Sequence, residues 1–313
     1  MPTLAGDLRH RAPPLWHAEP VTGQRVPAPL LVVMAIASVQ TGSAVARTLF
    51  DDLGVSGTAL LRLVIAATVL LVLLRPPLRS WTRRQWLAAL VLGVALAGMN
   101  LVFYLSLDLV PLGVAVTVEF TGPLLLALVQ TRRWVDLMWA LVAAGGVALL
   151  GSQAATGDIA VMGLVLAFVA GLFWALYIVS SARVGRVVPG VDGLAVALAI
   201  AALLVLPFGA SGAVGVVDAP GALALVTLVA LLSSVIPYGF ELLALRRMST
   251  RVFGVLMSLQ PGAAALSGWV ILGQSLGAVE LTALAMVTVA SAGITLASRP
   301  DHRADEPLVG PVG

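Results

Sequence analysis

The chain is divided along its length into apolar runs of roughly 18–23 residues, the length of helix needed to cross the hydrocarbon core of a bilayer. Of its 313 residues, 60% are hydrophobic and only 11% are charged. A soluble domain contains about a quarter charged residues, so this composition is too apolar for one. The sequence therefore predicts an all-α membrane protein in which each apolar run forms a spanning helix.

About ten spans are predicted, and the connections between them are too short to hold a soluble domain. The first run could also be interpreted as a signal peptide, because small residues occur near its end. Its length, its polar residues Gln40 and Thr41, and the further spans behind it favour a retained helix. The spans are placed near 29–48, 57–75, 86–106, 110–130, 134–152, 159–181, 190–210, 221–245, 250–272 and 277–298.

Arginine residues alternate between the connections, and this alternation predicts the orientation. Basic residues accumulate in short loops on the cytoplasmic side of membranes. Every second connection is rich in arginine, so both the N and C termini are expected in the cytoplasm. The membrane itself is expected to be a bacterial-type cytoplasmic (inner) membrane. The arginine-rich connections hold Arg75, Arg79, Arg83, Arg84, Arg132, Arg133, Arg183, Arg186, Arg246, Arg247 and Arg251. The opposite connections hold Asp51, Asp52, Asp108, Asp158, Asp218 and Glu280, with Arg47 at a border.

The two halves of the membrane region resemble each other at an offset of about 138 residues. Residues 113–123 then align with 251–261, and the aligned stretches end at Pro123 and Pro261. Five spans per half is an odd number, so the second copy must enter the bilayer from the opposite face, as in inverted-repeat transporters. The predicted organisation is a disordered cytoplasmic tail (1–28), two five-helix repeats (29–152 and 159–298) and a cytoplasmic tail (299–313).

Several kinds of chemistry are excluded by what the sequence lacks. Cysteine is absent, and His10, His17 and His302 lie in the polar tails, so the spans offer no thiolate or imidazole. The chain has no HExxH motif, phosphate-cradling glycine loop or nucleophile elbow, so neither an enzyme nor an ATP-driven pump is expected. No cofactor, metal site or nucleic-acid partner is predicted.

Ionisable residues inside the spans are the first candidates for function, because burying such groups is costly unless they pair or face water. Glu119 lies midway along the fourth span, and Pro123 lacks the N–H that the carbonyl of residue 119 would accept. Glu119 is therefore a candidate site for an ammonium group, a cation or a proton. The alternative is a salt bridge to Arg62 or a kink without function. Arg62 and Arg47 lie near the outer ends of their spans, where their side chains can also extend to the membrane surface.

Glu241 in the eighth span is a second candidate for proton coupling. It lies one turn after Pro237, which frees the carbonyl of Ser233. A structural pair with Arg246 or Arg247 is the alternative. Weaker polar candidates, most of which are expected to join helices to one another, are Asn100, Tyr104, Ser106, Thr117, Thr121, Tyr238, Ser258 and Gln260.

Six segments carry a family resemblance: Ala37–Ala44 (ASVQTGSA), Gly98–Ser106 (GMNLVFYLS), Val110–Val116 (VPLGVAV), Glu119–Pro123 (EFTGP), Trp174–Tyr177 (WALY) and Phe253–Ser258 (FGVLMS). Together they resemble the threonine/homoserine exporter branch of the drug/metabolite transporter superfamily, which is built from two EamA-like repeats. The resemblance extends over nearly the whole membrane region. It implies a ten-helix inverted-repeat transporter that exports small neutral amino acids against an inward flow of protons.

The sequence departs from the family pattern at one position. Gln274 stands where relatives usually have glutamate, so any proton coupling by that acid would pass to Glu119 or Glu241 here. Our hypothesis for the mechanism is alternating access around a central cavity lined by the broken fourth and ninth helices. In it, Arg62 attracts the substrate carboxylate and Glu119 pairs with its ammonium group or takes a proton. The predicted substrate-binding set is Glu119, Arg62, Asn100, Tyr104, Gln260 and Tyr238, and the predicted helix breaks are Pro123, Pro261 and Pro237.

Two alternatives stay open at this point. Export of another metabolite or of an amphipathic drug would use aromatic surface, which Trp174, Tyr177 and Trp269 offer. A membrane partner protein without transport would have no need of buried charges and proline breaks. The expected partners are a small-molecule substrate, protons and the lipid bilayer, and a homodimer is left open.

Overall fold

The computed structural model describes residues 26–130, 134–156, 159–188, 190–217, 219–245 and 247–297. The predicted tails, 1–28 and 299–313, lie outside these residues apart from 26–28. The three histidines and Arg132, Arg133, Arg246, Asp158 and Asp218 also lie outside them.

The described residues form helices and no strands. Ten stretches among them are long and apolar enough to cross a membrane, which confirms the prediction of a ten-helix all-α membrane protein. The elements are α1 (Ala28–Arg47), α2 (Phe50–Leu74), η2 (Leu78–Ser80), α3 (Arg83–Leu107), α4 (Leu112–Glu119), α5 (Thr121–Gln130), α6 (Trp134–Thr156), α7 (Val161–Gly185), α8 (Asp192–Ala213), η3 (Val214–Val217), α9 (Pro220–Ala230), η4 (Leu231–Val235), α10 (Ile236–Leu245), α11 (Thr250–Met257), α12 (Gln260–Leu272) and α13 (Ala278–Ala297).

Helix α2 begins earlier than the predicted span 57–75. It starts at Phe50 and kinks at Gly54, whose backbone angles of φ 66° and ψ 162° suit glycine because it has no Cβ. Asp51 and Asp52 lie in the first turn, where carboxylates interact favourably with the positive end of the helix dipole. Residues assigned to a connection by the hydropathy pattern therefore begin the second helix.

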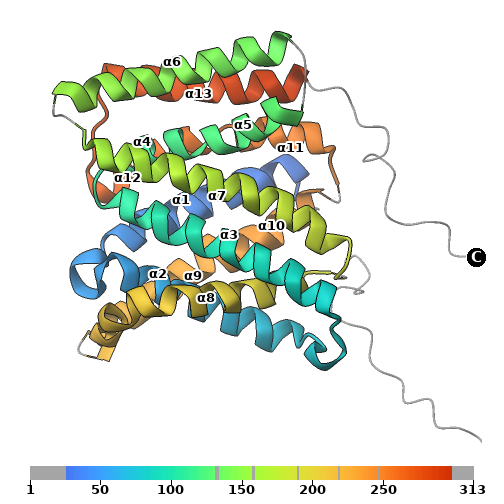
Figure 1. Ribbon diagram of the computed structural model, residues 1–313. Coiled ribbons are helices and arrows are strands. Elements are labelled where there is room, and N and C mark those ends of the chain that lie inside the picture. The colour runs from blue at the N-terminus through green and yellow to red at the C-terminus, as the bar shows by residue number, and fades with distance from the viewer. Residues whose placement is uncertain are drawn as a thin grey trace, which may run out of the picture.

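The helices are arranged in layers (Figure 1). Helices α6 and α13 pack together at one edge of the bundle, at the top of the view, and α2 packs on α8 at the opposite edge. Between these pairs, α3 packs on α7, and α1 packs on α10 and α12. The central helices carry most of the predicted site residues.

Three spans are interrupted near their middle. The fourth changes from α4 to α5 at Phe120, and the ninth changes from α11 to α12 at Ser258 and Leu259. Phe120 and Ser258 occupy corresponding places when 113–123 is aligned with 251–261. The eighth span contains a π-helical turn, η4, and Pro237 is the second residue of α10, which follows it. A proline lies close after each interruption because its missing N–H disrupts regular helical hydrogen bonding.

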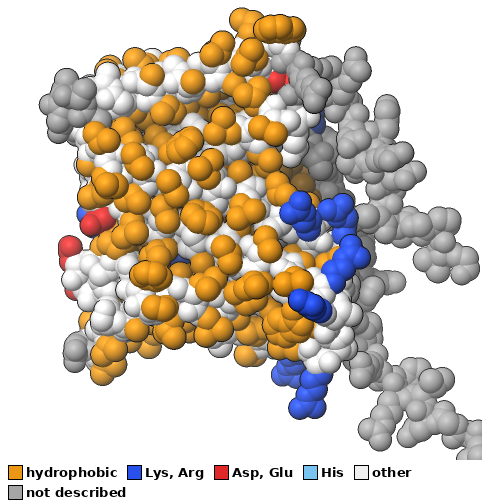
Figure 2. Space-filling model, in the orientation of Figure 1, with side chains coloured by type: hydrophobic (Ala, Val, Ile, Leu, Met, Phe, Trp, Pro, Cys, Tyr) orange, Lys and Arg blue, Asp and Glu red, His pale blue; other side chains and the backbone are white. Residues whose placement is uncertain are grey.

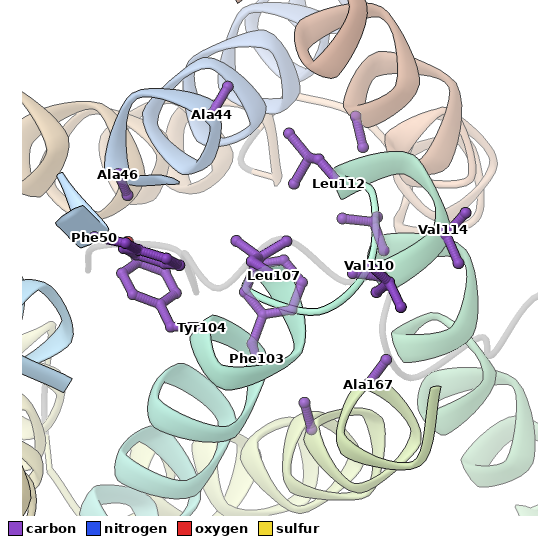
Figure 3. Packing of buried hydrophobic residues seen from close by; sticks show 14 of the residues in the cluster. Ala44, Ala46, Phe50, Phe103, Tyr104, Leu107, Val110, Leu112, Val114 and Ala167 are labelled. Carbon is purple, nitrogen blue, oxygen red and sulfur yellow. The ribbon is translucent and has the colours of Figure 1, made fainter. Parts of the chain in front are cut away.

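One end of the bundle is closed by its largest cluster of buried hydrophobic residues, and Figure 3 shows Phe50, Leu107 and Leu112 among them. Arg47 joins the helices at this end. Its Nη2 lies 3.2 Å from Oδ1 of Asp108, and its Nε donates to the carbonyl of Leu107 at 3.0 Å. We call this the closed end.

Arginine side chains gather at the other end, at the right of Figure 2. Both ends of the described chain also lie here. Leu31 on α1 belongs to a cluster that includes Ala244 and Met248, and Arg251 donates to the carbonyl of Leu296 on α13. We call this the arginine-rich end, and its placement in the cytoplasm stays a prediction.

Candidate functional site

A cavity of about 450 Å³ lies in the middle of the bundle and extends toward the arginine-rich end. Its lining residues come from α1 to α5, α7, η4 and α10 to α13. The structure brings eight predicted residues to this cavity, and Tyr104 and Pro261 are not among its lining. The eight are Arg62, Asn100, Glu119, Pro123, Pro237, Tyr238, Glu241 and Gln260.

Arg62 points into the protein and not toward the membrane surface. Its Nη1 donates to the hydroxyl of Tyr104 and its Nη2 to the carbonyl of Ser233, each at 3.1 Å. The guanidinium also lies 5.4 Å from the centre of the Tyr104 ring, within range of a cation–π contact. Arg62 is only 8% exposed, so extension of its side chain to the surface is not what the structure shows.

The carbonyl that receives Arg62 is available because of the local sequence. Pro237 has no N–H to offer the carbonyl of Ser233, and Ser233 itself lies in the π-helical turn η4. The neighbouring carbonyl of Leu232 accepts a hydrogen bond from Ser38 on α1 at 2.7 Å. The irregular turn is thus held by side chains from two other spans, a typical use of π-turns at functional sites.

Glu119 ends α4 and lies at the cavity wall, 8% exposed. Among the described residues it has no ion pair with Arg62, so the salt bridge considered as an alternative is not formed. Helix α7 passes close beside the break that follows Glu119. A Cβ placed on Gly171 would lie 2.4 Å from the Glu119 carbonyl, and one on Gly122 would lie 1.8 Å from the Gly171 carbonyl.

Amide side chains supply the uncharged polar part of the cavity. Gln40 on α1 donates through Nε2 to Oε1 of Gln260 at 3.3 Å, while its own Oε1 is buried without a hydrogen-bond partner. Asn100 donates through Nδ2 to the carbonyl of Leu96 in its own helix at 2.8 Å. These contacts fix the amides while leaving hydrogen-bonding capacity unused.

Glu241 and Tyr238 lie on the same helix, α10, and both line the cavity. Within the part of the chain that the structure describes, Glu241 forms no ion pair with Arg247, the partner in the alternative interpretation. Arg246 lies outside the described residues. The cavity therefore holds one guanidinium and two carboxylates without a direct ion pair among them.

The structure also adds residues that the sequence did not select. Gln40 and Ser233 belong to the site, and the signals for them were a polar residue inside the first span and the proline that follows Ser233. Phe120 packs edge-on against Trp174 with ring centres 5.1 Å apart, which gives the cavity an aromatic wall. Trp269 is 63% exposed and does not line it.

The arrangement suits a small dipolar molecule. Its volume is in the range of small-molecule sites, and its walls are mainly apolar with a few polar groups from different helices. The described residues contain no group of three or more acidic or histidine side chains that could hold a metal ion. Ten membrane helices, three interrupted spans and a central cavity with buried charges define a membrane transporter.

Comparison with known proteins identifies the family. The EamA-like transporter family matches residues 161–296. The threonine/homoserine exporter RhtA of Escherichia coli (strain K12) is 39% identical over 280 residues, which is 88% of this chain and 94% of that protein. RhtA of Salmonella typhimurium (strain SL1344) is 39% identical over 273 residues, 86% of this chain and 92% of that protein. The chain belongs to the EamA-like transporter family, so it is a transporter and not an enzyme.

Proposed function

We propose that the protein exports small neutral amino acids resembling threonine and homoserine across a bacterial inner membrane, in exchange for protons. One observation carries the proposal: Arg62 and Glu119 line the same cavity with opposite charges and are not paired with each other. The names of the relatives, which cover nearly all of the chain, support the substrate class.

A zwitterion fits this pattern of charge. We assign the carboxylate to Arg62 because this cation lines the cavity and has no carboxylate partner among the described residues. Glu119, which lines the same cavity, is assigned to the ammonium group. Asn100, Tyr238 and Gln260 are left to contact the polar side chain, while Tyr104 holds Arg62 from behind.

Protons have two candidate carriers, Glu119 and Glu241, because both carboxyl groups lie at the cavity wall. Gln274 stands where the family resemblance implies a glutamate, and its amide cannot carry a proton. Its Oε1 accepts from the backbone N–H of Leu112 at 3.0 Å and so caps the start of α4. This position therefore retains a structural role at the closed end, and coupling is assigned to the two glutamates.

The fold also supports a proposal of alternating access. The cavity extends toward the arginine-rich end while hydrophobic side chains fill the closed end, so we assign this structure to the state that receives substrate from the cytoplasm. Packing supports two equivalent inverted halves, 29–152 and 159–298. Under their alignment α2 corresponds to α8 and α6 to α13, and each of these pairs packs against its counterpart.

The test is counterflow and efflux of labelled threonine and homoserine in proteoliposomes, with and without a pH gradient. Glu119→Gln should abolish stimulation by the gradient, whereas Asp52→Asn, which removes an exposed carboxylate at the closed end, should not. Absence of transport by the parent protein would refute the substrate class. Equal stimulation of the parent and Glu119→Gln would refute the role of Glu119.

A second candidate is export of a more hydrophobic metabolite or an amphipathic drug. Trp174, Tyr177 and Phe120 favour it because they line the cavity. Competition for threonine counterflow by a panel of amino acids and lipophilic cations separates the two candidates. Stronger competition by the cations than by homoserine would favour the second. A homodimer stays a prediction.

A further inference from the structure

A second cavity, of about 380 Å³, lies outside the central one. It is found at the arginine-rich end, where the start of α3 meets the end of α7. Arg84, Arg183 and Arg186 line it together with Ala88 and Val187. Three arginines therefore line one cavity: Arg84 near the start of α3, Arg183 in the last turn of α7, and Arg186 directly after α7.

The backbone around this cavity is well fixed. Thr82 and Gln85 form a capping box at the start of α3, in which each side chain bonds the other's backbone N–H. The Nε2 of Gln85 also donates to the carbonyl of Val187 at 2.9 Å, joining α3 to the segment after α7. The start of α3 and the segment that holds Arg186 are thus joined by a hydrogen bond beside the cavity.

Within the described part of the chain, the charges of these three arginines are not neutralised by a carboxylate. Among the described residues, none of them has a carboxylate within ion-pair distance, and the ion pair of Arg47 lies at the far end of the bundle. Like charges around one hollow repel each other, and a bound anion relieves that repulsion. Arginine is also the side chain best suited to bind phosphate through paired N–H donors.

Apolar surface leads away from the cavity along the same helices. On α3, Leu87, Val91 and Val94 follow Arg84 at helical spacing, and all three are exposed. Trp86 beside them is also exposed and packs on Trp81, with ring centres 5.4 Å apart. Tryptophans of this kind are typical of the level of lipid headgroups.

Exposed apolar side chains also continue along α7, at Val165, Phe168 and Leu172. They lie on the membrane-crossing part of the helix that ends at the basic cavity. A free anion would use only the guanidinium groups. A lipid would use the guanidinium groups and the apolar surface together.

We propose that this cavity binds the phosphodiester headgroup of an anionic phospholipid, with acyl chains along the outer surface of α3 and α7. Basic cavities between helices at the cytoplasmic level of a membrane are suited to such headgroups. The inference is independent of the transported substrate, because no residue of the second cavity lines the central one.

The experiment uses the full chain in detergent, titrated with phosphatidylglycerol, phosphatidylcholine or inorganic phosphate while thermal unfolding is followed. Phosphatidylglycerol should raise the unfolding temperature of the parent, and the other two should not. The variant Arg84→Gln/Arg186→Gln loses two positive charges, and each charge is equivalent to roughly a fivefold change in affinity. Phosphatidylglycerol should therefore bind this variant about 25-fold more weakly than the parent. Arg75→Gln/Arg79→Gln removes the same charge at the same end and should bind like the parent.

Three outcomes overturn the proposal. An equal effect of the two double variants would show only general attraction to basic charge. An equal effect of inorganic phosphate would show a free-anion site. Native mass spectrometry of the parent tests the lipid without any variant, and equal retention of phosphatidylglycerol and phosphatidylcholine would also contradict the proposal.

Discussion

The contact between Gly122 on α5 and Gly171 on α7 gives the sharpest test of the structure. A Cβ at position 122 would lie 1.8 Å from the carbonyl oxygen of Gly171, whereas Cβ contacts below 3.0 Å are essentially never seen. The two backbones would have to separate by about 1.2 Å, because no side chain is present whose rotation could relieve the clash. Overpacking of this kind costs about 1–3 kcal/mol. We therefore expect Gly122→Ala to lower the free energy of unfolding by about 2 kcal/mol.

Gly151→Ala is the matched control, because Gly151 is also helical but a Cβ there would meet nothing within 4 Å. Replacing an unconstrained helical glycine by alanine stabilises a helix by about 0.5–1 kcal/mol. Unfolding of both variants in mixed detergent with increasing dodecyl sulfate gives the comparison. If Gly122→Ala proves as stable as Gly151→Ala, the close approach of α5 and α7 is wrong.

Three further predictions follow from the cavity and its closed end. Tyr104→Phe keeps the ring under Arg62 but removes its hydroxyl acceptor, so the free energy of unfolding should fall by about 1–3 kcal/mol in the same assay. Pro237→Ala restores an N–H that competes with Arg62 for its carbonyl acceptor, so the KM for the exported amino acid should rise in efflux measurements. Asp108→Asn removes the ion pair with Arg47, so a cysteine introduced at the closed end should react faster with an impermeant maleimide, and an unchanged rate would contradict a closing role.

Some of the fold is predictable from sequence because membranes impose simple rules. Apolar runs had to span the bilayer as helices, since unpaired backbone groups are very unfavourable in hydrocarbon. The coincidence of Glu119 and Pro123 pointed to an interruption, and the structure ends α4 at Glu119. The start of α2 was misplaced because Gly54 allows a kink that hydropathy does not register.

The site itself depended on contacts between distant segments, which no local pattern encodes. Arg62 was near enough to a span end to reach the surface, and only the packing of Tyr104 and Ser233 around it shows that it turns inward. Gln40 pairs with Gln260, far away in sequence, so its place in the cavity could not be inferred from the first span alone. The second cavity could not be predicted either, because the alternation of arginines between connections predicts orientation in the membrane. It does not predict which arginines line the same cavity.

The ion pair at the closed end gives the two membrane faces different sensitivities to salt. Arg47 and Asp108 are 29% and 45% exposed, so dissolved ions can approach and screen their attraction. We expect a rise in ionic strength on that side alone to favour opening of the cavity toward it. The same rise at the arginine-rich end would weaken binding of anions there without loosening the closed end. Such a transporter would therefore respond differently to a rise in ionic strength at its closed end and to the same rise at its arginine-rich end.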